Sequence, residues 1–262
     1  MKQLQKFVDF LINNNVILGI SVWCYCLITI EEFYVNINYN LLLFILLATL
    51  FSYTLLKRIP KLEKLLALNK TTVFLLILFI ALIFLFAKLL WFQKVVFAFC
   101  FLVILFYGYS IFGSKKLRKI PYIKITPVAM VWSLATCFVI IYDKIELFTV
   151  VIATLQRFLL FTAIMILFEI VDLKTDCKSL KTIPQVFGIK TAKKIVFALL
   201  ILHLAITLTY VFSFFQILLF TGILVFLIFI NNKKSRYYTT FWLEILPVIC
   251  LAVYLYRSYN MF

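Results

Sequence analysis

The sequence predicts an all-α integral membrane protein built as a single nine-helix transmembrane bundle, and two observations lead to this fold class. First, 66% of the 262 residues are hydrophobic and 14% are charged, whereas a soluble domain is about 45–50% apolar and about 25% charged. Second, glycine and proline number five each, so the frequent turns and alternating strands of an outer-membrane barrel are missing from the pattern. The apolar residues instead form runs long enough to cross a bilayer as helices.

Nine apolar runs give the expected helices. The first run follows Lys2 and Lys6 and carries no small-residue cleavage site, so we interpret it as a retained span and not as a signal peptide. The segment YVFSFFQ, residues 210–216, is interpreted as a turn between two helices, with a kink in one longer helix as the alternative. Within one domain, 1–262, the nine expected spans are residues 15–30, 39–56, 71–87, 95–112, 125–142, 148–170, 195–212, 214–230 and 242–257.

The positions of the basic residues predict the orientation of the bundle. With the N-terminus in the cytoplasm, twenty-one of the twenty-six Lys and Arg residues fall in cytoplasmic segments, four fall outside, and Arg157 lies within a span. Because Lys and Arg collect in cytoplasmic loops, we expect the N-terminus inside and the C-terminus outside. The formal net charge of +16 then reflects topology, and we expect membrane lipids and no nucleic acid as partners. The expected location is the cytoplasmic membrane of a bacterium.

A polar stretch interrupts this apolar chain at FEIVDLKTDCKSLKTIPQVFG, residues 168–188. Glu169, Asp172 and Asp176 lie at positions i, i+3 and i+7, a spacing that puts three carboxylates on one helical face. Carboxylates do not face lipid at that depth, so we expect this face to point into the bundle or into an aqueous cavity. The sequence therefore predicts a carboxylate-bearing mouth on the cytoplasmic side.

Two chemical interpretations of this mouth stay open on spacing alone. Mg²⁺ takes oxygen ligands, usually one or two carboxylates together with substrate phosphates and water, and nearby Lys and Arg residues hold phosphate oxygens. Such a mouth on an apolar bundle suits an amphiphilic phosphate ester, with its headgroup at the mouth and its hydrocarbon between the helices. The alternative is that the three acids solvate a helix end beside six lysines and balance their charge.

Two charges lie outside this mouth but inside or beside the expected spans. Arg157 must face the interior, because a charge near the centre of a span costs roughly 2.5–3.5 kcal/mol on insertion scales; it contacts an anionic ligand or, as we favour, pairs with a polar neighbour. Glu244 lines the same cavity or, as we favour, lies at the membrane interface. The acids expected in outer loops are Glu31, Glu32, Asp143 and Glu146.

Two stretches carry a resemblance to a known family. EIVDLKTDCKSLKTIPQVFGIKTAKK resembles the second aspartate-rich motif of the UbiA superfamily of intramembrane prenyltransferases, and YGYSIFGSKKLRKIPYIK (107–124) is similar to the Tyr-Ser…Lys-Arg segment before that family's fifth helix. The matching residues of the first stretch are Asp172, Asp176, Lys181, Thr182, Ile183, Pro184 and Gly188, and those of the second are Tyr109, Ser110, Arg118 and Lys119.

This resemblance implies a fold, a reaction and a set of site residues. The fold is the nine-helix UbiA bundle, and the reaction is a Mg²⁺-dependent transfer of an isoprenyl group from a prenyl diphosphate to an aromatic or lipid acceptor. Asp172 and Asp176 are then the catalytic residues and the metal ligands. The implied diphosphate-binding residues are Tyr109, Arg118, Lys119 and Lys181, and the remaining cavity candidates are Arg157 and Glu169.

The chain departs from the family's pattern after the second expected helix. The family's first motif, an Asn followed by aspartates, belongs there, but the sequence is ATLFSYTLLKRIPKLEKLL (48–66), in which Glu63 is the only acid. Val171 also stands where an Arg is common among relatives. A catalytically degenerate member, which binds lipid or acts as a scaffold without turnover, is therefore the alternative.

Overall fold

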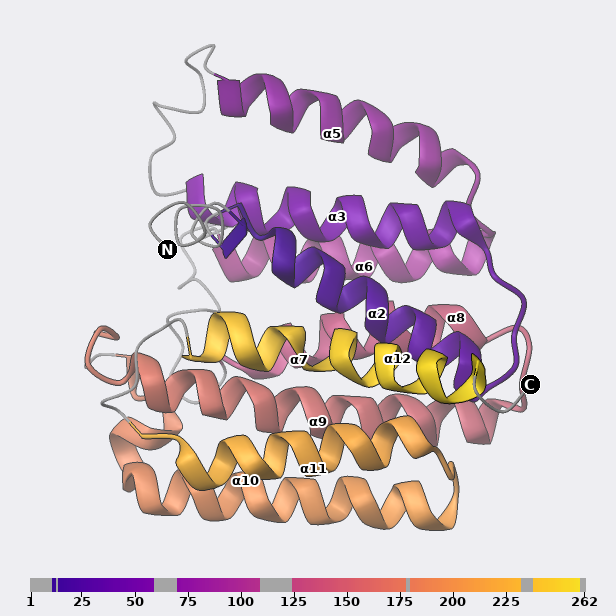
Figure 1. Ribbon diagram of the computed structural model, residues 1–262. Coiled ribbons are helices and arrows are strands. Elements are labelled where there is room, and N and C mark those ends of the chain that lie inside the picture. Colours follow the sequence, from indigo (N-terminus) through magenta and orange to yellow (C-terminus); the bar gives the residue numbers. More distant parts are fainter. Residues whose placement is uncertain are drawn as a thin grey trace.

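The computed structural model describes residues 11–12, 14–58, 70–108, 124–177, 180–231 and 238–259. Across these ranges the chain is helical and contains no strand (Figure 1). Five helices are long and apolar enough to cross a membrane, and they are Tyr39–Lys57, Trp91–Gly108, Leu147–Asp172, Ile183–Thr209 and Tyr238–Tyr256. The described part of the chain thus confirms the expectation of an all-α, membrane-type protein.

Each expected span overlaps a helical segment of the described ranges, but the seventh, expected from residue 195, begins twelve residues earlier at Ile183. The elements are α2 (Val16–Glu32), α3 (Tyr39–Arg58), α5 (Lys70–Ala87), α6 (Trp91–Gly108), α7 (Thr126–Ser133), the π-helical η3 (Leu134–Phe138), α8 (Val139–Ile141), α9 (Leu147–Asp172), α10 (Ile183–Thr209), α11 (Phe214–Phe229), the π-helical η5 (Tyr238–Leu243) and α12 (Glu244–Tyr259). The fifth expected span is the continuous unit α7–η3–α8, and the ninth is η5 followed by α12.

The turn between α10 and α11 separates two helices, so the interpretation of residues 210–216 as a turn is confirmed. Ser213 has an extended backbone, and its side-chain oxygen accepts a hydrogen bond from the backbone N–H of Gln216. This contact satisfies one of the free N–H groups that every helix start exposes. The local sequence therefore begins a new helix here and does not continue the old one.

The start of α10 is built from the residues that follow the polar stretch. Thr182 takes the N-cap position in an extended conformation, and its backbone N–H donates to the side-chain Oε1 of Gln185 at 3.1 Å. Pro184 lies in the first turn, where its missing N–H costs nothing. Gly188 then breaks the helix with a φ of +78°, a conformation that favours glycine. The chain after α9 is thus turned back into the bundle within a few residues.

Successive helices run in opposite directions, so the bundle has two distinct ends (Figure 1). We call one the Asp172 end, where α3, α6, α9 and α11 stop and α7 and α10 start. The other is the Glu32 end, where α2, α5, α8, α10 and α12 stop. Most described basic residues lie toward the Asp172 end: Lys57, Lys124, Lys174, Lys181, Lys190, Lys193 and Lys194.

The core lies where α2, α7 and α9 meet. The ring of Phe161 makes edge-to-face contacts with Tyr25, at 4.9 Å between centroids, and with Trp132, at 5.2 Å. Around this core, α9 packs against α7 and α10, α2 packs against α3 and α12, and α11 packs against α10 and α12. The helix α5 packs mainly on α3 and leaves much of its surface exposed. Two cavities lie beside this core, and Trp132 lines both of them.

Candidate functional site

A polar cavity of about 470 Å³ opens inside the bundle toward the Asp172 end. It is bounded by the start of α2, the end of α3, α7, the end of α9, and the η5–α12 junction. Its lining residues are Ile12, Asn15, Ile17, Leu18, Tyr53, Lys57, Trp132, Met165, Phe168, Asp172, Thr240 and Glu244. Two carboxylates, one lysine and neutral polar groups thus share one cavity with an apolar floor.

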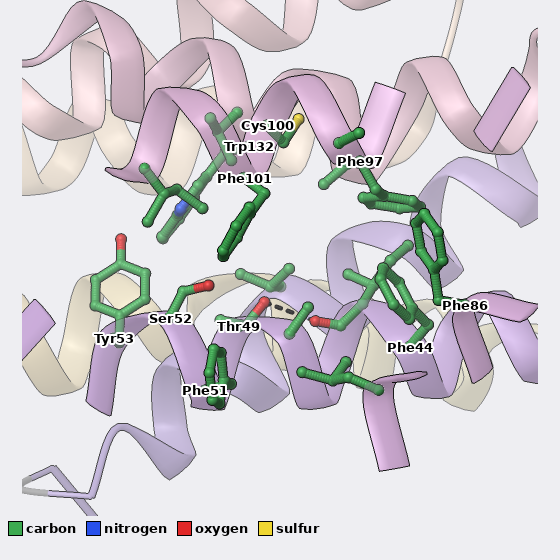
Figure 2. Close-up of a pocket in the computed structure, with 18 of the residues that line it drawn as sticks. Phe44, Thr49, Phe51, Ser52, Tyr53, Phe86, Phe97, Cys100, Phe101 and Trp132 are labelled. Atoms are coloured by element: carbon green, nitrogen blue, oxygen red, sulfur yellow. Dashed lines mark hydrogen bonds between the residues drawn. The ribbon is translucent and has the colours of Figure 1, made fainter. Parts of the chain in front are cut away.

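An apolar pocket of about 400 Å³ lies next to it, between α3, α5, α6 and the α7–η3 unit (Figure 2). Tyr53 and Trp132 line both spaces, and their ring centroids are 6.4 Å apart. The polar cavity and the apolar pocket therefore meet at these two aromatic rings. A charged and polar lining on one side of the two rings thus lies beside an apolar lining on the other.

Asp172 and Asp176 do not share the polar cavity. Asp172 is the last residue of α9 and lines the cavity, whereas Asp176 lies in the bend that follows and forms an ion pair with the Nζ of Lys124. The expectation that one helical face carries these acids holds only in part, because α9 ends at Asp172 and Asp176 lies in the turn beyond the helix. The carbonyl oxygen of Asp172 still accepts the backbone N–H of Asp176 at 2.8 Å, which keeps the two residues one turn apart.

The other predicted site residues fall in three places. Glu169 is 4% exposed and accepts the backbone N–H of Ile183 at 3.3 Å, so it joins the end of α9 to the start of α10 and is not among the cavity-lining residues. Lys181 is exposed in the turn before α10, with a φ of +45°. Tyr109, Arg118 and Lys119 lie outside the described residues.

Arg157 lies near the Glu32 end, far from the polar cavity. Its Nη2 is 3.0 Å from Glu32 Oε2 and donates to Thr29 Oγ1 at 3.0 Å. Fifteen helical residues separate it from Asp172, which corresponds to roughly 22 Å along α9. Arg157 therefore pairs with polar neighbours, the interpretation that we favoured over contact with an anionic ligand. Glu32, expected as an outer-loop acid, is instead buried within the bundle.

Sequence reasoning missed Lys57 as a member of the polar cavity and Glu32 as a buried acid, and it favoured the wrong one of two places for Glu244. Glu244 lines the polar cavity, which was the alternative to the membrane interface, and comes from a different helix than Asp172. Lys57 was counted only as a cytoplasmic charge. Glu32 carried one signal that pointed to its burial, because an arginine inside a span requires a carboxylate or polar partner somewhere in the chain.

Two side chains of the polar cavity are of the type that binds Mg²⁺. Mg²⁺ commonly binds through one or two carboxylates and completes its shell with phosphate oxygens and water, and Asp172 and Glu244 supply two carboxylates. Within the described residues no group of three or more His, Cys, Asp or Glu side chains is placed to hold a metal ion. A fully protein-built metal cage is therefore not formed by the part of the chain that the structure describes.

Comparison with known proteins adds no assignment to this geometry. No protein-family model, no curated protein and no solved structure matches the chain.

Proposed function

We propose that this chain is a UbiA-type intramembrane prenyltransferase, which transfers an isoprenyl group from a prenyl diphosphate to an aromatic or lipid acceptor. One observation carries the proposal: the polar cavity and the apolar pocket meet at Tyr53 and Trp132. A prenyl diphosphate has the same division, with a multiply charged head joined directly to an apolar chain. Its head is matched to the cavity with Lys57, Asp172 and Glu244, and its chain to the apolar pocket.

The roles of the residues follow from where the charge develops. The bond between the first prenyl carbon and the bridging oxygen breaks, the diphosphate leaves with the electron pair, and the allylic cation alkylates the acceptor, which loses a proton. Lys57 neutralises charge on the departing diphosphate. A Mg²⁺ ion, when held by Asp172 and Glu244, would supply further charge neutralisation there. The rings of Tyr53 and Trp132 flank the carbon that becomes cationic, and ring faces stabilise cations.

A second candidate function, lipid binding without turnover, is favoured by a different observation. Asp176 is held by Lys124, so the two aspartates of the resembling motif do not act as a pair in this structure. A bundle with the same cavity and pocket, but without the residues needed to ionise the diphosphate, would still bind a prenyl-type lipid. The two candidates differ in one product, which is free diphosphate.

The test uses the purified full chain with farnesyl and geranylgeranyl diphosphate, with and without Mg²⁺. We expect Mg²⁺-dependent binding that falls by about tenfold or more in Asp172→Asn/Glu244→Gln, because hydrogen bonds and contacts to charged groups are worth roughly 1.5–3 kcal/mol each. The matched control is Asp143→Asn/Glu146→Gln, two exposed acids near the Glu32 end. Equal binding with and without Mg²⁺, and in the unmodified chain and the cavity variant, would contradict the proposal. Release of radiolabelled diphosphate then separates transfer from binding without turnover.

A further inference from the structure

We infer that three phenylalanines at the far end of the apolar pocket set the length of hydrocarbon chain that the site accepts. They are Phe44 on α3, Phe86 on α5 and Phe97 on α6, and we call them the phenylalanine stop. The inference deepens the proposed function and rests on it for the identity of the headgroup. The selection itself depends only on the shape of the pocket.

The phenylalanine stop lies opposite the junction with the polar cavity. Figure 2 shows Tyr53 and Trp132 toward one end of the pocket and Phe44, Phe86 and Phe97 together at the other. Nine residues of α3 separate Tyr53 from Phe44, so the pocket runs roughly 13 Å along that helix. A chain whose first carbon lies at Tyr53 therefore points its tail at the three rings.

The three rings close the pocket because they pack on one another. The ring of Phe44 lies 4.7 Å from that of Phe97 and 6.0 Å from that of Phe86, between centroids. Phe44 and Phe97 are buried, with 7% and 8% of their surface exposed. Since the rings come from three different helices, they stand across the direct path of a longer chain along α3.

The body of the pocket differs from this end, because small side chains lie there beside the rings of Phe51, Phe79 and Phe101. Its small lining residues are Ala48, Thr49, Ser52, Ala98, Cys100 and Ala135. Ala48 lies one helical turn from Phe44 and one turn from Ser52, so the three share a face of α3. The space along this face exists because residue 48 has a single methyl group, and it ends where residue 44 has a ring.

The experiment measures how affinity depends on chain length in variants that lengthen or shorten the pocket. The ligands are geranyl, farnesyl and geranylgeranyl diphosphate, and the three corresponding prenyl alcohols, each in the same detergent. Phe97→Ala and Phe86→Ala remove a ring of the stop, and Ala48→Leu fills the body. The matched controls are Phe99→Ala and Phe84→Ala, two positions along the same helices with side chains 46% and 61% exposed.

The expected result is a shift in preference and not a general loss of binding. In Phe97→Ala and Phe86→Ala, the affinity ratio of the longest to the shortest ligand rises by about tenfold, because the longer tail no longer has to displace a packed ring. Ala48→Leu shifts the same ratio the other way. Phe99→Ala and Phe84→Ala leave the ratio within about twofold of that of the unmodified chain.

The arms of the test separate this inference from the proposed function. Length selection by the alcohols that shifts in the variants supports the phenylalanine stop even if no diphosphate binds, in which case the proposed function alone fails. Mg²⁺-dependent diphosphate binding with an unchanged length ratio in Phe97→Ala, Phe86→Ala and Ala48→Leu overturns the stop while the proposed function stands. If the alanine variants do not fold, Phe97→Leu and Ala48→Leu decide by the same criterion.

Discussion

The guanidinium of Arg157 and the carboxylate of Glu32 form an ion pair of 3.0 Å, with each side chain 1% exposed. Both oxygens of the carboxylate are used, because Oε1 also accepts the hydroxyl of Ser213 at 2.7 Å and the side-chain amide of Gln216. The guanidinium carbon in turn lies 5.6 Å from the centre of the Tyr25 ring. This cluster ties α2, α9 and α11 together near the Glu32 end.

Breaking this pair from one side should be costly. We expect Arg157→Met and Glu32→Gln each to lower the free energy of unfolding by about 3–5 kcal/mol, because each leaves a buried charge without its partner. The double variant should lose less than the sum of the two, by about 2 kcal/mol or more. Thermal unfolding in detergent measures this cycle, with Lys144→Met, an exposed cation near the same end, as the control. Strict additivity would show that the two charges do not stabilise each other.

The ion pair between Lys124 and Asp176 should behave differently, because both side chains are partly exposed, at 16% and 14%. The pair lies between an exposed pair, which contributes about 0–1 kcal/mol, and a buried one, whose disruption costs about 3–5 kcal/mol. Asp176→Asn should therefore lower the free energy of unfolding by about 1–2 kcal/mol, and the charge swap Lys124→Asp/Asp176→Lys should restore part of it. Since Asp176 does not line the polar cavity, Asp176→Asn should also alter Mg²⁺-dependent prenyl diphosphate binding by less than about threefold. Titration calorimetry on Asp176→Asn beside Asp172→Asn checks this. Equal losses in the two would mean that Asp176 leaves Lys124 when ligand binds.

Cys177 gives a direct measurement of orientation. None of the six cysteines forms a disulfide within the described residues, and Cys177, in the turn after α9, is exposed whereas the other five are buried. With the Asp172 end in the cytoplasm, a membrane-impermeant maleimide should label Cys177 in opened cells and not in intact ones, and Cys177→Ser should abolish the labelling. Lys144→Cys in the Cys177→Ser background places a thiol near the Glu32 end and should label in intact cells. The reverse pattern would invert the topology.

The contact between α11 and α12 should be sensitive to a side chain at position 222. A Cβ added to Gly222 would lie 2.6 Å from Cδ1 of Leu246, so one of the two helices or the leucine side chain has to move. We expect Gly222→Ala to lower the free energy of unfolding by about 1–3 kcal/mol, a typical cost of overpacking. In the Leu246→Ala background, Gly222→Ala should lower the free energy of unfolding by less than it does in the unmodified chain. Thr221→Ala, at the exposed neighbouring position, is the control.

The helices could be predicted because the signal for them is local. Apolar runs of spanning length are properties of neighbouring residues, and the described helices overlap them. The largest shift at a described boundary is at α10, which starts at Ile183 and not at residue 195, because Lys190, Lys193 and Lys194 make its first turns polar. The helix α6 also starts early, at Trp91 and not at residue 95. The polar Gln93 and Lys94 hid this start, although Gln93 Oε1 accepts the N–H of Leu90 and so caps the first turn.

The candidate site could be predicted only in part, because it depends on contacts between distant residues. Asp172 is at the mouth of a cavity, as its polarity in an apolar chain suggested, but its cavity partners Glu244 and Lys57 come from the ends of other helices. Whether Asp176 joined it depended on where α9 stopped, a difference of one helical turn. The assignments of Arg118 and Lys119 to the diphosphate stay predictions, since both lie outside the described residues.

The pairing of Glu32 with Arg157 also has a consequence for how the chain is made. The carboxylate leaves the ribosome 125 residues before its partner, and as the last residue of α2 it can stay hydrated at the membrane surface in the meantime. Arg157 has no such refuge, because it lies eleven residues into a 26-residue helix. Glu32 is therefore already made when Arg157 enters the membrane, so the arginine can find its carboxylate partner as soon as α9 reaches α2.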